Sequence, residues 1–86
     1  MGYVLIADDE AAFRQMLAAA VSSAGFAVRT AGDGEEALAL AAGEPPELVF
    51  MDLQMGARAM TGLDALEAMR ARHPEVPVVL RSEGVV

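Results

Sequence analysis

The chain contains no cysteine and no lysine. The absence of cysteine excludes a disulfide framework and any metal site built from thiolates. All six basic residues are arginines, they are spread along the sequence without forming a basic stripe, and the net charge is −7. This distribution argues against direct binding of this segment to nucleic acid or to an anionic membrane surface.

Long hydrophobic runs are also absent. No apolar stretch is long enough to cross a bilayer, and the first residues lack the basic and apolar parts of a signal peptide. We therefore expect a cytoplasmic protein without a membrane partner. Aromatic residues are only 5% of the 86 residues, while 55% are hydrophobic, so the core must be built from Ala, Leu, Val and Met. This length is enough for one domain.

One short stretch organises the chain. Residues 48–51 are apolar and run directly into Asp52, which is followed by ten residues with two glycines and no hydrophobic period. Such a run between loop residues is typical of a buried strand in a parallel sheet. A second run, residues 3–7, ends in the same way in Asp8, Asp9 and Glu10. If the two strands are parallel neighbours, three aspartates meet at the carboxyl edge of the sheet, where ligands bind in open α/β folds.

The expected meeting of Asp8, Asp9 and Asp52 has a chemical consequence. Carboxylates that lie close together raise one another's pKa unless a cation neutralises them. Oxygen ligands of this kind suit a hard divalent cation. We therefore predict a Mg²⁺ site at this edge.

The remaining pattern alternates helices and strands. We expect strands at 3–7, 26–30, 48–51 and 76–80, and helices beginning near Glu10, Asp33 and Thr61 or Gly62. Gly25 is expected to end the first helix in the left-handed conformation. The predicted apolar faces of the first and third helices are Phe13, Met16, Leu17, Ala20 and Val21, and Leu63, Leu66 and Met69. The order predicts an α/β fold of three layers, a parallel sheet with helices on both faces.

Several motifs together resemble the receiver domain of two-component response regulators. They are residues 4–10 (VLIADDE), 31–38 (AGDGEEAL), 51–55 (MDLQM), 61–63 (TGL), 73–74 (HP) and 76–79 (VPVV). Each motif alone is weak, but their order and spacing are fairly specific and cover nearly the whole chain. The resemblance implies a flavodoxin-like sheet, here with strand order 2-1-3-4.

The resemblance also implies a function. A sensor histidine kinase would transfer a phosphoryl group to Asp52 with Mg²⁺, in a signalling module that is not itself an enzyme. In the full-length protein this module would either be joined to an output domain, in the regulation of transcription, or act alone. Asp9 and Asp52 would hold the ion directly, Asp8 through a water, and the backbone carbonyl of Gln54 would add one ligand. Ser82 would be the hydroxyl that switches toward the phosphoryl oxygens.

Three departures from the family pattern stand out. The family carries a lysine after a fifth strand, whereas this chain has no lysine and its pattern stops after the fourth strand. The loop after Asp52 is about two residues longer than in the family and lacks a proline, and Arg81 and Glu83 flank Ser82 unusually. We therefore expect residues 1–86 to form a single, incomplete receiver domain that lacks the last helix, strand and helix. Such a domain leaves a strand edge open. We therefore expect either a fragment or altered form of a longer receiver, or completion by another chain as a homo-oligomer or domain-swapped dimer.

Other interpretations stay open. The chain could be a degenerate pseudo-receiver that pairs with a partner or with itself and is never phosphorylated. A Mg²⁺-dependent phosphohydrolase is a weaker alternative, because the usual second aspartate two residues after Asp52 is replaced by Gln54. Asp8 and Asp9 could merely cap a helix. Arg81 could replace the missing cation, although we favour a solvated arginine at this position.

Overall fold

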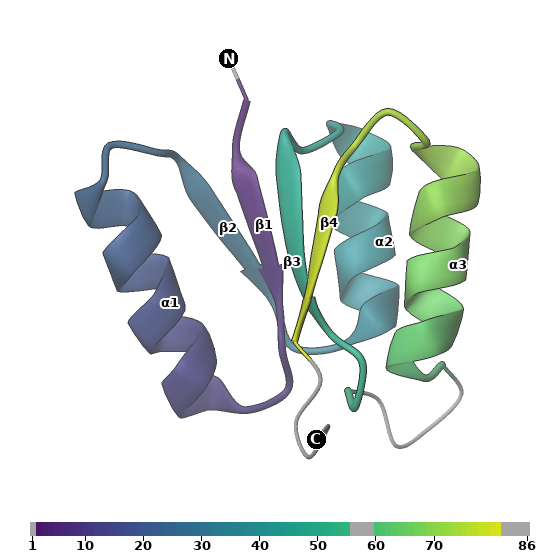
Figure 1. The fold of residues 1–86 in the computed structure, drawn as a ribbon, viewed down its shortest axis with the longest axis horizontal. Coiled ribbons are helices and arrows are strands. Elements are labelled where there is room, and N and C mark those ends of the chain that lie inside the picture. The colour runs from purple at the N-terminus through teal and green to yellow at the C-terminus, as the bar shows by residue number, and fades with distance from the viewer. Residues whose placement is uncertain (1, 56–59, 82–86) are drawn as a thin grey trace.

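The computed structural model describes residues 2–55 and 60–81, in which strands and helices alternate strictly (Figure 1). The bounds lie within about two residues of those predicted, and the order is the one predicted from the sequence. The elements are β1 (Val4–Ala7), α1 (Ala11–Ser23), β2 (Val28–Ala31), α2 (Gly34–Gly43), β3 (Leu48–Asp52), α3 (Gly62–Arg72) and β4 (Val78–Arg81).

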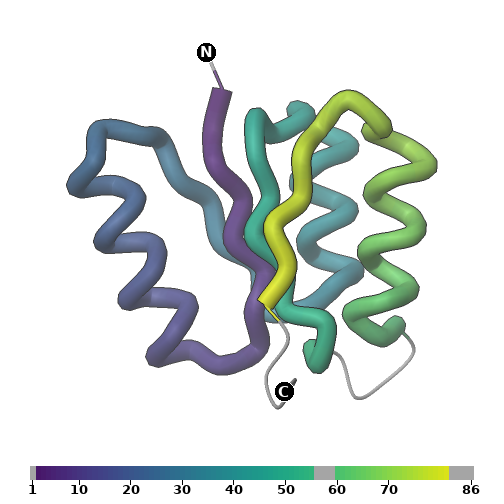
Figure 2. The backbone as a smooth tube through the Cα atoms, viewed as in Figure 1, coloured from purple at the N-terminus to yellow at the C-terminus, as the bar shows by residue number. Residues whose placement is uncertain are grey.

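The four strands form one parallel sheet in the order β2-β1-β3-β4. This confirms the predicted fold class and strand order. β1 lies in the middle, with Ala7 beside Ala31 of β2 and beside Met51 of β3. Figure 2 shows β1 and β3 running side by side, with their carboxyl ends at the same edge.

The main core lies between the sheet and the pair α2 and α3. Alternate strand residues point into it, because successive side chains of a strand face opposite sides of the sheet. The largest of its fully buried side chains are Leu5, Val49, Met51, Met55 and Met69.

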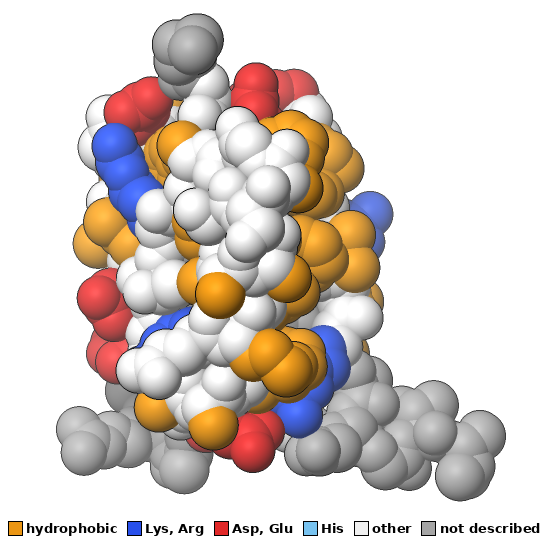
Figure 3. All heavy atoms as spheres, turned by 90° about the vertical axis from the view of Figure 1, so that its left-hand side faces the viewer, with side chains coloured by type: hydrophobic (Ala, Val, Ile, Leu, Met, Phe, Trp, Pro, Cys, Tyr) orange, Lys and Arg blue, Asp and Glu red, His pale blue; other side chains and the backbone are white. Residues whose placement is uncertain are grey.

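Among the described residues, α1 is the one helix that covers the opposite face of the sheet, and this layer is thin (Figure 1). No residue of α1 is fully buried, and Met16, which belongs to the predicted apolar face, is 61% exposed. Leu63 of α3 is likewise exposed, whereas Leu66 and Met69 are buried as predicted. Figure 3 views α1 from outside and shows hydrophobic side chains gathered along one side of it.

Local sequence explains where the helices begin and end. Gly25 follows α1 with φ of +100°, a conformation that favours glycine. Asp33 caps α2 by accepting a hydrogen bond from the Glu36 N–H at 2.8 Å. Thr61 and Asp64 form a reciprocal capping box at the start of α3. None of the helices in the described part of the chain is long and apolar enough to span a membrane.

Gly62 sets the position of α3 against the sheet. A Cβ atom at this residue would collide with the backbone carbonyl groups of Asp52, the last residue of β3, and of Leu53, which comes next. The absence of a side chain therefore lets the first turn of α3 approach the end of the strand that carries Asp52.

Candidate functional site

Strand pairing brings three carboxylates together at the carboxyl edge of the sheet. Asp8 directly follows β1, Asp52 is the last residue of β3, and these two strands are parallel neighbours. One oxygen each from Asp8, Asp9 and Asp52 lie within 4.8 Å of one another. Asp8 is 2% exposed and Asp52 5% exposed, whereas Asp9 is exposed to solvent. The convergence expected from the two strand ends is therefore present.

Each buried carboxylate is oriented by a backbone N–H group two residues further along. The Oδ1 atom of Asp8 accepts a hydrogen bond from the Glu10 N–H at 2.9 Å, and the Oδ1 atom of Asp52 accepts one from the Gln54 N–H at 3.0 Å. Glu10 is the N-cap residue of α1, and no side-chain cap bond forms there. The role of a plain helix cap therefore does not account for Asp8.

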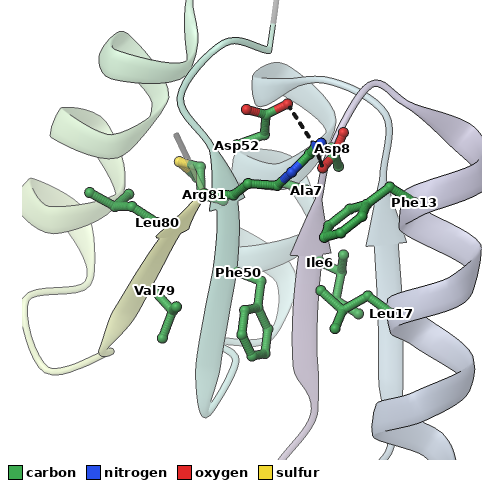
Figure 4. A pocket seen from close by; sticks show the side chains of 11 residues that line it. Ile6, Ala7, Asp8, Phe13, Leu17, Phe50, Asp52, Val79, Leu80 and Arg81 are labelled. Atoms are coloured by element: carbon green, nitrogen blue, oxygen red, sulfur yellow. Dashed lines mark hydrogen bonds and ion pairs between the residues drawn. The ribbon is translucent and has the colours of Figure 1, made fainter. Parts of the chain in front are cut away.

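The second oxygen of each buried carboxylate faces Arg81, the last residue of β4. Its Nη1 atom lies 2.7 Å from Oδ2 of Asp8 and 3.6 Å from Oδ2 of Asp52, and its Nη2 atom lies 3.2 Å from Oε1 of Glu10. Figure 4 shows the guanidinium group between the two aspartates, with the Phe13 ring beside it. The Arg81 Cζ atom lies 4.0 Å from the centroid of that ring, a cation–π contact. The favoured prediction of a solvated Arg81 is wrong.

Sequence reasoning gave too little weight to Arg81 and missed Phe13 and Arg14. The argument that places Asp52 at the ligand-binding edge applies equally to Arg81, since Asp52 and Arg81 are paired in register. Arg14 donates a hydrogen bond from Nη1 to the backbone carbonyl of Asp8 at 2.7 Å, which supports the turn between β1 and α1. Nothing in the sequence pattern of α1 distinguishes Phe13 and Arg14 from ordinary helix positions.

The electrostatic environment changes the acidity of Asp52. Burial raises the pKa of its carboxyl above the usual range, and the negative charges of Asp8 and Asp9 act in the same direction. The Gln54 N–H and the Arg81 guanidinium oppose this rise. The site therefore favours positive charge close to Asp52.

The residues present suit a hard divalent cation. The site offers carboxylate oxygens from three side chains, and the Oδ2 atoms of Asp8 and Asp52 already attract a positive group. Gln54 follows Asp52 closely enough for its N–H to reach Oδ1, so its backbone belongs to the same turn. Ser82 and Glu83 lie outside the described residues, as do residues 56–59 of the long loop after Asp52.

Comparison with known proteins agrees with this geometry. The family model for the response regulator receiver domain matches residues 4–84. The nitrogen assimilation regulatory protein NtrX of Azorhizobium caulinodans is 38% identical over 79 residues, which are 92% of this chain and 17% of that protein. The probable transcriptional regulatory protein TcrX of Mycobacterium tuberculosis is 38% identical over 77 residues, 90% of this chain and 32% of that protein.

Solved structures give the same result. The crystal structure of the receiver domain of NtrX from Brucella abortus superimposes with a TM-score of 0.86 at 38% sequence identity, covering 90% of this chain and 64% of that one. The chain thus spans less than a third of the length of the two curated relatives above. The chain belongs to the response regulator receiver domain family, the signalling modules of two-component systems.

Proposed function

We propose that this receiver domain accepts a phosphoryl group on Asp52 from a sensor histidine kinase in the cytoplasm, with Mg²⁺ as the cofactor. One observation carries the proposal: the buried Asp52 carboxylate converges with those of Asp8 and Asp9 at the carboxyl edge of a parallel sheet. Asp9 and Asp52 would hold the ion directly, Asp8 through a water, and the Gln54 backbone carbonyl would add a ligand. Ser82 would provide the switch hydroxyl.

The carboxylate of Asp52 is the nucleophile in this proposal. The Gln54 N–H holds Oδ1, so Oδ2 is the oxygen that faces the pocket. A bond forms between this oxygen and phosphorus, while the bond from phosphorus to the kinase imidazole nitrogen breaks and its electron pair stays on that nitrogen. Mg²⁺, when bound, supplies neutralisation of the charge on the phosphoryl oxygens.

The product is an acyl phosphate at a buried strand end. It adds about −1.5 to −2 charges to a site that already holds three carboxylates. Arg81 is the positive side chain in contact with Asp8 and Asp52, so its position must respond to this charge. A local charge change of this kind is how a receiver shifts between two surface conformations that partners distinguish. In a longer protein, the partner would be an output domain that regulates transcription.

A second candidate function is a pairing module that is not phosphorylated. Two observations favour it: a guanidinium group already pairs with two carboxylates of the acidic site, and the sheet is thinly covered beside α1. A hollow of about 160 Å³ lies there, lined by side chains that include Ile6, Phe13, Leu17, Phe50 and Val79. In the described part of the chain, the outer edge of β4 has no neighbouring strand, and Val79 and Leu80 are 45% and 44% exposed. A second copy of this chain could extend the sheet at that edge.

Treatment with acetyl phosphate and Mg²⁺, followed by intact mass spectrometry, tests the first proposal. We expect the mass of one phosphoryl group to appear in the wild-type chain and in Glu35→Gln, which removes an exposed carboxylate in the first turn of α2. It should be absent from Asp52→Asn. If no mass gain depends on Asp52, phospho-acceptance by this chain is wrong.

Two further measurements separate the alternatives. Light scattering that gives twice the monomer mass, whether or not acetyl phosphate is present, would support the pairing module. A monomer that unfolds cooperatively would reject completion of the sheet by a second copy. Catalytic release of phosphate from diverse esters would instead identify a phosphohydrolase.

A further inference from the structure

The guanidinium group of Arg81 occupies the acidic site in a specific way. Its Nη1 atom contacts the Oδ2 atoms of Asp8 and Asp52, the two carboxylate oxygens that face away from the backbone N–H groups of the adjacent turns. The Arg81 side chain is 25% exposed, so it lies at the mouth of the site and reaches inward (Figure 4). Because these oxygens face the pocket, a cation in this site would have to share it with the guanidinium group.

We propose that Arg81 is a resident counter-cation that competes with the divalent cation for the Oδ2 atoms of Asp8 and Asp52, so that metal binding displaces its guanidinium group. This inference rests on the proposed function, because it takes the three aspartates as the metal site. It gives Arg81 a role in setting how tightly the site binds metal, in addition to the role of the aspartates as ligands.

Geometry makes the two occupants mutually exclusive. A Mg²⁺ ion needs its oxygen ligands at about 2.0–2.1 Å in near-octahedral order. A water that links the ion to Oδ2 of Asp8 would need the hydrogen-bonding space where Nη1 now lies, 2.7 Å from that oxygen. The ion and the guanidinium would also repel each other strongly if both lay in this partly buried site.

The surroundings of Arg81 offer it a second position. Glu10 accepts a hydrogen bond from Nη2 at 3.2 Å and is itself 57% exposed at its side chain, so it can keep its partner while the guanidinium moves outward. The Phe13 ring packs against the guanidinium on the α1 side. Displacement therefore exchanges a buried partner, Asp8, for solvent while Glu10 is kept, and it breaks an ion pair between the end of β4 and the turn after β1.

Direct measurement of Mg²⁺ binding by calorimetry tests the competition. Arg81→Met keeps an unbranched apolar stem and removes the charge, and we expect it to bind Mg²⁺ at least about tenfold more tightly than wild type, a ratio that equals roughly 1.4 kcal/mol. Arg72→Met is the matched control, since it changes the net charge equally at an exposed position in the last turn of α3. It should stay within about twofold of wild type, because screening weakens distant surface charges.

A second measurement uses only the wild-type chain, in case Arg81→Met fails to fold. The Phe13 ring shifts the NMR signals of the Arg81 guanidinium protons, whose Cζ atom lies 4.0 Å from the ring centroid. Titration with Mg²⁺ should move these signals toward their solvent-exposed values. Arg81 signals that stay unchanged while the Asp52 signals respond to Mg²⁺ would overturn the proposal.

The outcomes distinguish this inference from the function on which it rests. Equal Mg²⁺ affinity in wild type and in a folded Arg81→Met, lost in Asp52→Asn, would refute competition by Arg81 and leave the metal site intact. If neither wild type nor Arg81→Met binds Mg²⁺ through Asp52, the metal site itself is wrong and the competition falls with it. Tighter binding in Arg81→Met, with no change in Arg72→Met, supports the proposal.

Discussion

Replacement of Gly62 by alanine should destabilise the chain much more than the loss of a glycine elsewhere. A Cβ atom at this position would lie 2.5 Å from the backbone carbonyl oxygen of Asp52 and would also collide with that of Leu53. These are backbone atoms at the end of a central strand, so they have little freedom to move away. Overpacking of this kind costs about 1–3 kcal/mol of unfolding free energy.

Gly43 provides the matched control for this substitution. It ends α2, and a Cβ atom built there would meet nothing within 4 Å. Alanine lowers the conformational entropy of the unfolded chain and has the higher helix propensity, so Gly43→Ala should be neutral or stabilising by up to about 1 kcal/mol. The two substitutions add the same methyl group and should change stability in opposite directions.

Thermal unfolding followed by far-ultraviolet circular dichroism measures both variants. In a chain of this size, a change of 1 kcal/mol moves the thermal midpoint by about 4–8 °C, so the expected separation is easily resolved. Gly62→Ala with wild-type stability would refute the close approach of α3 to the end of β3. If Gly43→Ala lost as much stability as Gly62→Ala, the argument that the space around the added Cβ atom decides the effect would be refuted.

Three further predictions concern side chains. Burial raises the pKa of Asp52, so the folded chain binds a proton at this carboxyl more readily than the unfolded chain, and the contribution of Asp52 to stability falls as the pH rises from the usual carboxyl range toward the raised pKa. Over this pH window, the urea midpoint of wild type should fall relative to that of Asp52→Asn. A difference between the two midpoints that does not change with pH would contradict the sign. Asp33→Ala removes the 2.8 Å cap bond from the Glu36 N–H and should cost about 1 kcal/mol in the same unfolding assay, whereas no loss would mean that the cap is unimportant. Tyr3→Phe removes a hydroxyl that donates to the Glu44 carbonyl at 2.6 Å and should cost about 0.5–1.5 kcal/mol, a value that calorimetry can check.

The fold could be predicted because its two central strands, β1 and β3, are largely buried. Continuous apolar runs that end in aspartates identify β1 and β3, and turn residues such as Gly25 and Asp33 identify the helix ends. Strand bounds were less accurate: β4 begins at Val78, two residues after its predicted start. Hydrophobic pattern reports burial, whereas a strand is defined by its hydrogen-bonded neighbour, and the two differ at strand ends.

The exposure of Met16 and Leu63, which the sequence pattern did not predict, has one physical cause. Met16 lies on the apolar stripe of α1 and Leu63 in the first turn of α3, yet both are exposed. Helical periodicity shows which side of a helix is apolar, but it does not show whether another element covers that side. The wrong prediction for Arg81 has a different origin, because a charged residue was judged by its usual solvation and not by the strand end on which it lies.

Arg81 also connects the two candidate functions. With its guanidinium between Asp8 and Asp52, part of the negative charge of the site is balanced without a metal ion, as a pairing module would need. With the guanidinium displaced toward Glu10, the same carboxylates are available to a divalent cation, as phosphoryl transfer needs. On the proposal made for Arg81, the balance between a receiver and a pseudo-receiver on this backbone depends on the free energy of one side chain moving between two sets of partners. If this is correct, Mg²⁺ concentration alone should shift the chain between the two states, and Arg81→Met should be able to occupy only the metal-binding one.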